Sequence, residues 1–269
     1  TDPDADRVGI VVKHNNEYIL LTGNQTGSIL IEYLLKTKTQ LNTLPKNPVI
    51  FNTVVTSDLG EKIANHYGVE VEKTLTGFKF IGEKIAKYEV THEKNFVFGY
   101  EESYGYLVEP FVRDKDAIQA CLLIAECMSY YKHEGLTLVD VLNDLYQRFG
   151  YHHEDQVSLT LKGSDGSQKI KSILNHFRTS IISDFAGFKV VGKEDYLLLE
   201  KTKDGNKTKL DFPPSDVIKY YLEDGTWLAI RPSGTEPKCK FYFCVLGKSE
   251  LDVKEKFNSI NQALKTHLE

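Results

Sequence analysis

The sequence has little cysteine, one methionine and no long apolar run, and each shortage excludes a class of protein. None of its four cysteines belongs to a CxxC pair, so neither a zinc ribbon nor a thioredoxin-like redox motif is indicated. Sparse, unpatterned cysteine in 269 residues is typical of a reducing cytoplasm. No apolar stretch approaches the roughly 20 residues of a membrane-spanning helix, and no segment has the layout of a secretory signal peptide.

The chain also lacks the basic excess of a nucleic-acid-binding surface, because its formal net charge is −5. Its composition, 41% hydrophobic and 26% charged, is that of an ordinary globular protein. The length favours about two domains. We therefore expect a cytoplasmic protein that binds neither nucleic acid nor a membrane.

Strand-like and helix-like segments alternate over the first 150 or so residues and predict an α/β fold with a parallel sheet. Residues 48–55 form a continuous apolar run rich in β-branched side chains, which is the pattern of a buried parallel strand. Residues 114–131 and 137–149 have helical periodicity. We place this α/β/α domain at residues 21–155.

The composition changes after residue 150. Residues 151–166 are polar and contain glycine, and we interpret the segment around His152, His153, Glu154 and Asp155 as a solvated linker. A smaller α+β domain is predicted for residues 156–269. Its expected strands and closing helix are residues 188–191, 196–200, 217–222, 226–230, 241–245 and 251–268.

An acidic string, TDPDADR, opens the chain. Asp2, Asp4 and Asp6 present a carboxylate at every second residue, and oxygen-rich ligation suits Mg²⁺ or Ca²⁺. An EF-hand is excluded, because Arg7 and Lys13 stand where that loop requires Gly and Glu. Three carboxylates leave open positions, which suits Mg²⁺ completed by a phosphate oxygen. The alternative is a solvated acidic terminus. Since nothing precedes the loop to support it, we interpret the chain as the C-terminal part of a longer protein.

A second loop, RPSGTEP at residues 231–237, follows a predicted strand. The guanidinium of Arg231 can make two hydrogen bonds to a phosphate, and the Ser233 and Thr235 hydroxyls can add further donors. Backbone N–H groups around Gly234 can form an anion-binding nest. The residue types favour phosphate over the alternative, a plain Pro-Gly turn.

Two further loops and one lysine are weaker candidates. GYEESYG at residues 99–105 puts Glu101 and Ser103 at the end of a strand, where open α/β sheets bind ligands. TGFK at residues 76–79 offers Lys79 to a phosphate or a hydroxyl. Lys115 is less specific still. Each of these has a plain alternative as a polar surface loop or a solvated helix start.

The order and spacing of the four loops resemble the α-D-phosphohexomutase superfamily along the whole chain. The closest branch is similar to the bacterial α-phosphoglucomutases, with phosphopentomutases nearby. The resemblance implies a third domain that is an α/β/α sandwich and a fourth with an antiparallel, TBP-like sheet. It assigns residues 1–20 to a remnant of the second domain, which carries the metal loop.

The resemblance also implies roles for individual residues. Asp2, Asp4 and Asp6 match the Mg²⁺ ligands of the family, although Pro3 stands where the family usually has Gly. The implied substrate-binding residues are Arg7, Thr76, Gly77, Lys79, Glu101, Ser103, Lys115, Arg231, Ser233, Gly234 and Thr235.

The implied reaction interconverts glucose 1-phosphate and glucose 6-phosphate by phosphoryl transfer through a phosphoserine, with glucose 1,6-bisphosphate as the intermediate. The phosphoserine loop of the family contains a Ser-His dipeptide, and this chain has none. The catalytic serine is therefore expected in missing N-terminal domains, and the isolated chain is expected to be inactive. Phosphomannomutase, phosphopentomutase and a non-catalytic phosphosugar-binding or Ca²⁺-binding module remain as alternatives.

Overall fold

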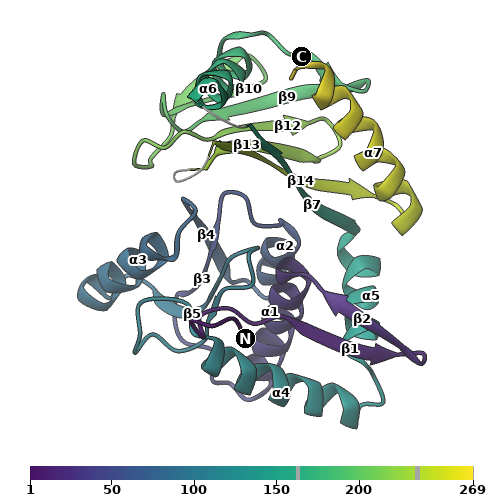
Figure 1. Ribbon diagram of the computed structural model, residues 1–269. Coiled ribbons are helices and arrows are strands. Elements are labelled where there is room, and N and C mark those ends of the chain that lie inside the picture. Colours follow the sequence, from purple (N-terminus) through teal and green to yellow (C-terminus); the bar gives the residue numbers. More distant parts are fainter. Residues whose placement is uncertain (162–163, 234–236, 269) are drawn as a thin grey trace. The chain divides into compact units, whose positions relative to one another are not determined.

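The computed structural model describes residues 1–161, 164–233 and 237–268, and the chain divides into two compact units (Figure 1). The first unit is Thr1–Phe149 and the second is Gly150–Glu269. The sequence placed this division after residue 155. It falls earlier because the strand that begins at Tyr151 pairs with the sheet of the second unit.

A four-stranded sheet in the order β4-β3-β5-β6 forms the centre of the first unit. Strands β3 (Pro48–Thr53), β4 (Glu70–Thr74) and β5 (Asn95–Tyr100) are parallel, and β6 (Tyr106–Leu107) pairs antiparallel with β5. β3 lies between two neighbours and is almost fully buried, as its continuous apolar run predicts. The predicted parallel α/β sandwich is confirmed.

Helices cover both faces of this sheet. Helix α3 (Phe78–Thr91) packs its apolar side on Val49 and Phe51 of β3. Helices α1 (Gly23–Gln40) and α2 (Leu59–His66) meet the other face, where Gly27 and Gly60 lie against the ring of Tyr100. Helices α4 (Ala117–His133) and α5 (Leu138–Phe149) complete the unit.

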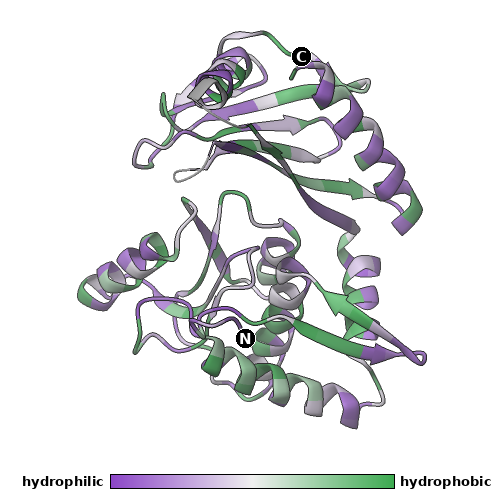
Figure 2. Ribbon diagram, in the orientation of Figure 1, coloured by the Kyte–Doolittle hydropathy of each residue, from purple (hydrophilic) through white to green (hydrophobic). Residues whose placement is uncertain are grey.

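A short antiparallel hairpin precedes the sandwich, formed by β1 (Ile10–His14) and β2 (Glu17–Leu21). It is a separate two-stranded sheet, and it is largely apolar in Figure 2. One face buries Val12 and Leu21, whereas Val11 and Leu20 on the other face are exposed. The assignment of residues 1–20 to a second mutase domain stays a prediction.

The second unit is built on one antiparallel sheet in the order β11-β10-β9-β12-β13-β14-β7, with β8 beside β9. These strands are β7 (Tyr151–Thr160), β8 (Asp184–Phe185), β9 (Phe188–Asp195), β10 (Glu200–Lys203), β11 (Asn206–Lys209), β12 (Ile218–Leu222), β13 (Trp227–Pro232) and β14 (Lys238–Gly247). Helices α6 (Ser164–Thr179) and α7 (Glu250–Thr266) pack on this sheet. The predicted smaller domain with an antiparallel sheet is confirmed.

Two predictions in this unit are wrong. The segment containing His152, His153, Glu154 and Asp155 is strand β7, not a linker, and all ten of its residues pair with β14. Its polar composition suits the edge of a sheet, where one side of the strand faces solvent. The strand predicted at residues 196–200 is a turn instead, with Leu199 at a φ of 56°, and β10 begins only at Glu200.

None of the described helices combines the length and the apolar character that crossing a membrane requires.

Candidate functional site

The acidic loop is a closed turn held by its own first aspartate. The Oδ1 atom of Asp2 accepts hydrogen bonds from the backbone N–H groups of Asp6 and Arg7, both at 3.3 Å. The turn passes through Ala5, whose φ of 56° lies in the left-handed region. As a result, carboxylate oxygens of Asp2, Asp4 and Asp6 lie within 4.8 Å of one another, and no other such cluster of acidic, His or Cys side chains occurs in the described residues.

One carboxylate of this cluster already has a cationic partner. The Lys115 Nζ lies 2.9 Å from Asp6 Oδ2 and 3.2 Å from Asp114 Oδ1. The hydrogen bond from Lys115 lowers the pKa of Asp6. Burial disfavours the charged Lys115, but its bonds to Asp6 and Asp114 outweigh burial and raise its pKa. Both groups are therefore charged at neutral pH.

The other carboxylate oxygen of Asp6 indicates whether this loop could bind a divalent cation. Asp6 Oδ1 is buried and has no hydrogen-bond partner among the residues that the structure describes. A buried carboxylate oxygen without a partner is unfavourable. A hard cation bound by Asp2, Asp4 and Asp6 would satisfy it, and oxygen donors are those that Mg²⁺ takes.

Glu101 lies at the carboxyl end of the parallel sheet, next to the acidic loop. Its Oε1 accepts a hydrogen bond of 2.9 Å from the backbone N–H of Gly77, which holds a φ of 114°. Burial raises the pKa of Glu101, while the bond from Gly77 and the charges of Lys115 and Arg7 act in the opposite direction. Only 6% of the residue is exposed. The structure thus brings Glu101 and Gly77 together at the carboxyl end of the sheet, where open α/β sheets bind ligands.

The acidic loop and the Glu101 loop are joined through their backbones. Arg7 pairs with Gly105 in an isolated β-bridge, and the Val8 N–H donates to the Tyr104 carbonyl at 3.1 Å. Ser103 lies half-buried between Glu101 and this bridge. These backbone contacts therefore hold the acidic loop beside the loop that carries Glu101 and Ser103.

Two predicted residues of the TGFK loop have weaker structural support. Lys79 is exposed, and its Nζ lies over the ring of Phe80 at 4.8 Å. Thr76 is half-buried, one residue before the Gly77 N–H that binds Glu101. Among the described residues, no hydrogen bond or ion pair ties the Lys79 ammonium to the acidic loop.

Sequence reasoning missed Glu102. The hydroxyls of Thr53 and Thr56 donate to Glu102 Oε2 at 3.3 and 3.4 Å. Burial and the neighbouring Glu101 raise the pKa of this carboxyl. Glu102 thereby ties the loop of Glu101 and Ser103 to the end of β3. In the sequence, Glu102 is indicated only by its position between Glu101 and Ser103, the two residues predicted to bind the sugar.

In the second unit, the predicted phosphate loop begins at the end of β13. Arg231 is half-buried, and its backbone lies opposite Lys240 of the neighbouring strand β14. The Ser233 N–H donates to the Lys238 carbonyl at 2.7 Å, which closes the base of the turn. Gly234 and Thr235 lie outside the described residues.

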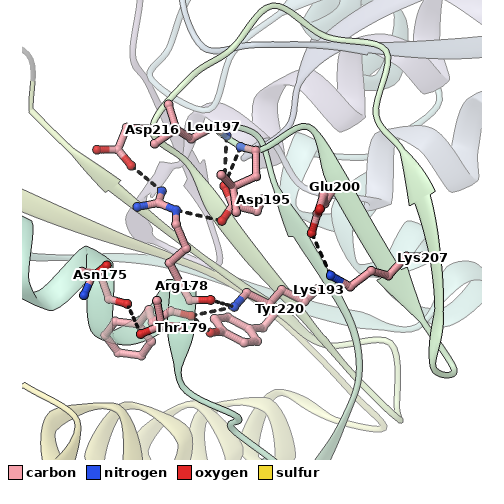
Figure 3. A network of polar contacts seen from close by, with 12 residues as sticks. Asn175, Arg178, Thr179, Lys193, Asp195, Leu197, Glu200, Lys207, Asp216 and Tyr220 are labelled. Carbon is pink, nitrogen blue, oxygen red and sulfur yellow. Dashed lines mark hydrogen bonds and ion pairs between the residues drawn. The ribbon is translucent and has the colours of Figure 1, made fainter.

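A separate cavity of about 580 Å³ in the second unit contains none of the predicted residues. Its main charges are paired internally (Figure 3). Arg178 bonds Asp195 at 2.8 Å and Asp216 at 2.6 Å, and Lys193 donates to the Phe177 and Arg178 carbonyls at the end of α6. This network fixes α6 to the sheet, and it offers no unpaired cluster for an anion.

Comparison with known proteins identifies both units. The domain III model described as "Phosphoglucomutase/phosphomannomutase, alpha/beta/alpha domain III" matches residues 22–149. The model described as "Phosphoglucomutase/phosphomannomutase, C-terminal domain" matches residues 187–251. The phosphoglucomutase of Staphylococcus aureus strain MRSA252 is 40% identical over 263 residues, which is 97% of this chain and 46% of that protein. The chain thus spans about half the length of the curated relatives it matches.

Solved structures agree on the fold. The pp63/parafusin phosphoglucomutase from Paramecium, in its open form, matches with a TM-score of 0.64 at 21% identity, over 99% of this chain and 43% of that one. An Aspergillus fumigatus N-acetylphosphoglucosamine mutase, solved with GlcNAc-6P and magnesium, matches with a TM-score of 0.51 at 13% identity, over 99% and 48%. At these identities the likeness concerns the fold alone.

Proposed function

Since the chain belongs to the phosphoglucomutase/phosphomannomutase family, we propose that it forms the sugar- and phosphate-binding half of a phosphoglucomutase. Such an enzyme interconverts glucose 1-phosphate and glucose 6-phosphate through glucose 1,6-bisphosphate. The 40% identity to a phosphoglucomutase favours this reaction over those of the other family branches. Its place is the cytoplasm, and its partners are a sugar phosphate and the preceding family domains.

The observation that carries the proposal is the backbone contact that holds the acidic loop beside the Glu101 loop. The loops meet through the Arg7–Gly105 bridge and through Lys115, which binds Asp6. A cation site next to a buried carboxylate and a hydroxyl suits a ligand that carries both phosphate and sugar hydroxyls.

Each group has a role in this reaction. Asp2, Asp4 and Asp6 would hold Mg²⁺, which neutralises charge on a transferring phosphoryl group when bound. Glu101 would accept hydrogen bonds from sugar hydroxyls, Ser103 would accept from them or donate to them, and Thr76, Gly77 and Lys79 would lie beside the sugar. Arg231, Ser233, Gly234 and Thr235 would hold the non-reacting phosphate. Phosphoryl transfer depends mainly on such positioning and charge stabilisation.

Two assays on the 269-residue chain test the proposal. Calorimetry with Mg²⁺ should show that glucose 6-phosphate and glucose 1-phosphate bind, and that mannose 6-phosphate and ribose 5-phosphate bind more weakly. A coupled assay for conversion of glucose 1-phosphate should detect no turnover, because the chain has no Ser-His loop.

Either of two results would contradict the proposal. Tighter binding of mannose 6-phosphate or ribose 5-phosphate would assign the chain to another branch of the family. Turnover at the rate of a complete mutase would show that the nucleophile lies within these residues.

A further inference from the structure

Lys115 is enclosed in the acidic site to a degree that is unusual for a lysine. Only 13% of its side chain is exposed, and its Nζ lies 2.9 Å from Asp6 Oδ2. Its aliphatic stem runs over Gly105, where an added Cβ would come within 2.4 Å of Lys115 Cδ. Because residue 105 is glycine and has no side chain, the aliphatic part of Lys115 can lie against it.

Backbone hydrogen bonds hold the segment around Lys115 against the acidic loop and against β6. The Ala117 N–H donates to the Ala5 carbonyl at 3.0 Å, and the Asp116 N–H donates to the Tyr106 carbonyl at 2.8 Å. Asp116 also caps helix α4 by accepting from the N–H groups of Ile118 and Gln119. These bonds hold Lys115 beside Asp6 independently of their ion pair.

The two oxygens of Asp6 consequently have different surroundings. Oδ2 accepts from Lys115, whereas Oδ1 is buried without a partner among the described residues. Oxygens of Asp2 and Asp4 lie within 4.8 Å of an oxygen of Asp6. A divalent cation on these three carboxylates would lie close to the Lys115 ammonium, and like charges at such separations repel measurably even near a protein surface.

We propose that Lys115 is a built-in counter-charge of the acidic loop, which stabilises the three carboxylates when no cation is bound and lowers the affinity of the loop for divalent cations. This inference rests on the proposed function, because it takes the acidic loop as the cation site. It assigns Lys115 a positioning role toward Asp6, in addition to any contact with substrate.

Mn²⁺ titration of the whole chain, followed by electron paramagnetic resonance, tests this role. Lys115→Met keeps most of the apolar stem and removes the charge. It should bind Mn²⁺ about fivefold more tightly than the unaltered chain, because one repelling charge is gone. In EDTA the same variant should unfold at a lower temperature, and Mn²⁺ should raise its unfolding temperature by more than it raises that of the unaltered chain.

Lys87→Met is the matched control. Lys87 is an exposed lysine of α3 whose ion pair is with Glu93 at 3.9 Å, so its loss should leave Mn²⁺ affinity unchanged. If Lys115→Met does not fold, Lys115→Gln is measured in the same way.

The outcomes separate the two claims. If the unaltered chain binds no Mn²⁺, the proposed cation site itself fails. If the unaltered chain binds Mn²⁺ and the Lys115 variants bind it equally or more weakly, the counter-charge role is overturned. Failure of both variants to fold even with excess Mn²⁺ would also overturn it, because the cation should then replace the missing charge.

Discussion

At the scale of single residues, Glu101 and Glu102 are two carboxyl groups of the candidate site whose burial disfavours ionisation. Glu101 is almost fully buried, and the hydrogen bond from the Gly77 N–H only partly offsets the burial. A group of this kind is retained against stability when function needs its charge. If Glu101 binds the sugar, its replacement should change stability and ligand binding in opposite directions.

Glu101→Gln should stabilise the chain at neutral pH and weaken sugar-phosphate binding. Because burial raises the folded-state pKa of Glu101 above its unfolded value, the folded chain binds more protons in between, and stability falls as pH rises through that window. Gln carries no charge, so the variant does not lose stability in this way. Its midpoint of thermal unfolding should exceed that of the unaltered chain at about pH 7.5, and the difference should be smaller at about pH 4. Calorimetry should show glucose 6-phosphate binding weakened by about ten- to a hundredfold, since a hydrogen bond to a charged group is worth about 1.5–3 kcal/mol.

A variant that binds glucose 6-phosphate as well as the unaltered chain would remove Glu101 from the binding site. Equal stability gains at both pH values would show that its ionisation is not the cause.

At the scale of elements, helix α1 shows what local sequence can and cannot predict. Its capping box is complete, with Gln25 N–H donating to Thr22 Oγ1 and Thr22 N–H donating to Gln25 Oε1, and the residues of that box are readable in the sequence. Gly23 and Gly27 nevertheless stand among its first five residues, and on their own they are more typical of a loop than of a helix. Gly23 is there for a tertiary reason, since the Glu102 carbonyl lies where a Cβ would be.

Gly23→Ala should therefore destabilise the chain, although alanine normally favours a helix. Its Cβ would lie 2.2 Å from the Glu102 carbonyl oxygen and 2.8 Å from the Tyr104 nitrogen, and both are backbone atoms that cannot rotate away. We expect a loss of about 1–3 kcal/mol in the free energy of unfolding, measured by urea denaturation.

Gly9→Ala provides the comparison. Its Cβ would meet nothing nearer than the Tyr104 ring at 3.9 Å, so its effect should stay within about 0.5 kcal/mol. If Gly23→Ala is as stable as Gly9→Ala, the close packing of α1 on the Glu101 loop is not significant.

At the scale of the whole molecule, the sequence predicted the two-part architecture because four loops in a fixed order resemble one superfamily, and the family models confirm that resemblance. The place of the division was harder to predict. The polar strand β7 resembles a linker until its ten pairings with β14 are known, and such pairings join residues far apart in the chain. The Lys115–Asp6 pair and the Glu102–Thr53 bond are of the same long-range kind. The predicted roles of the site residues remain predictions.

The central claim is that these loops bind a sugar phosphate, and backbone NMR of the ¹⁵N-labelled chain tests it most directly. With Mg²⁺ present, glucose 6-phosphate should give saturable shift changes in the loops at residues 2–7, 76–79, 101–105 and 231–235. Unphosphorylated glucose should leave the 231–235 loop unchanged, and so should glucose 6-phosphate with the Arg231→Ala variant. No saturable change at millimolar glucose 6-phosphate, or changes confined to the cavity beside Arg178 and Lys193, would contradict the account.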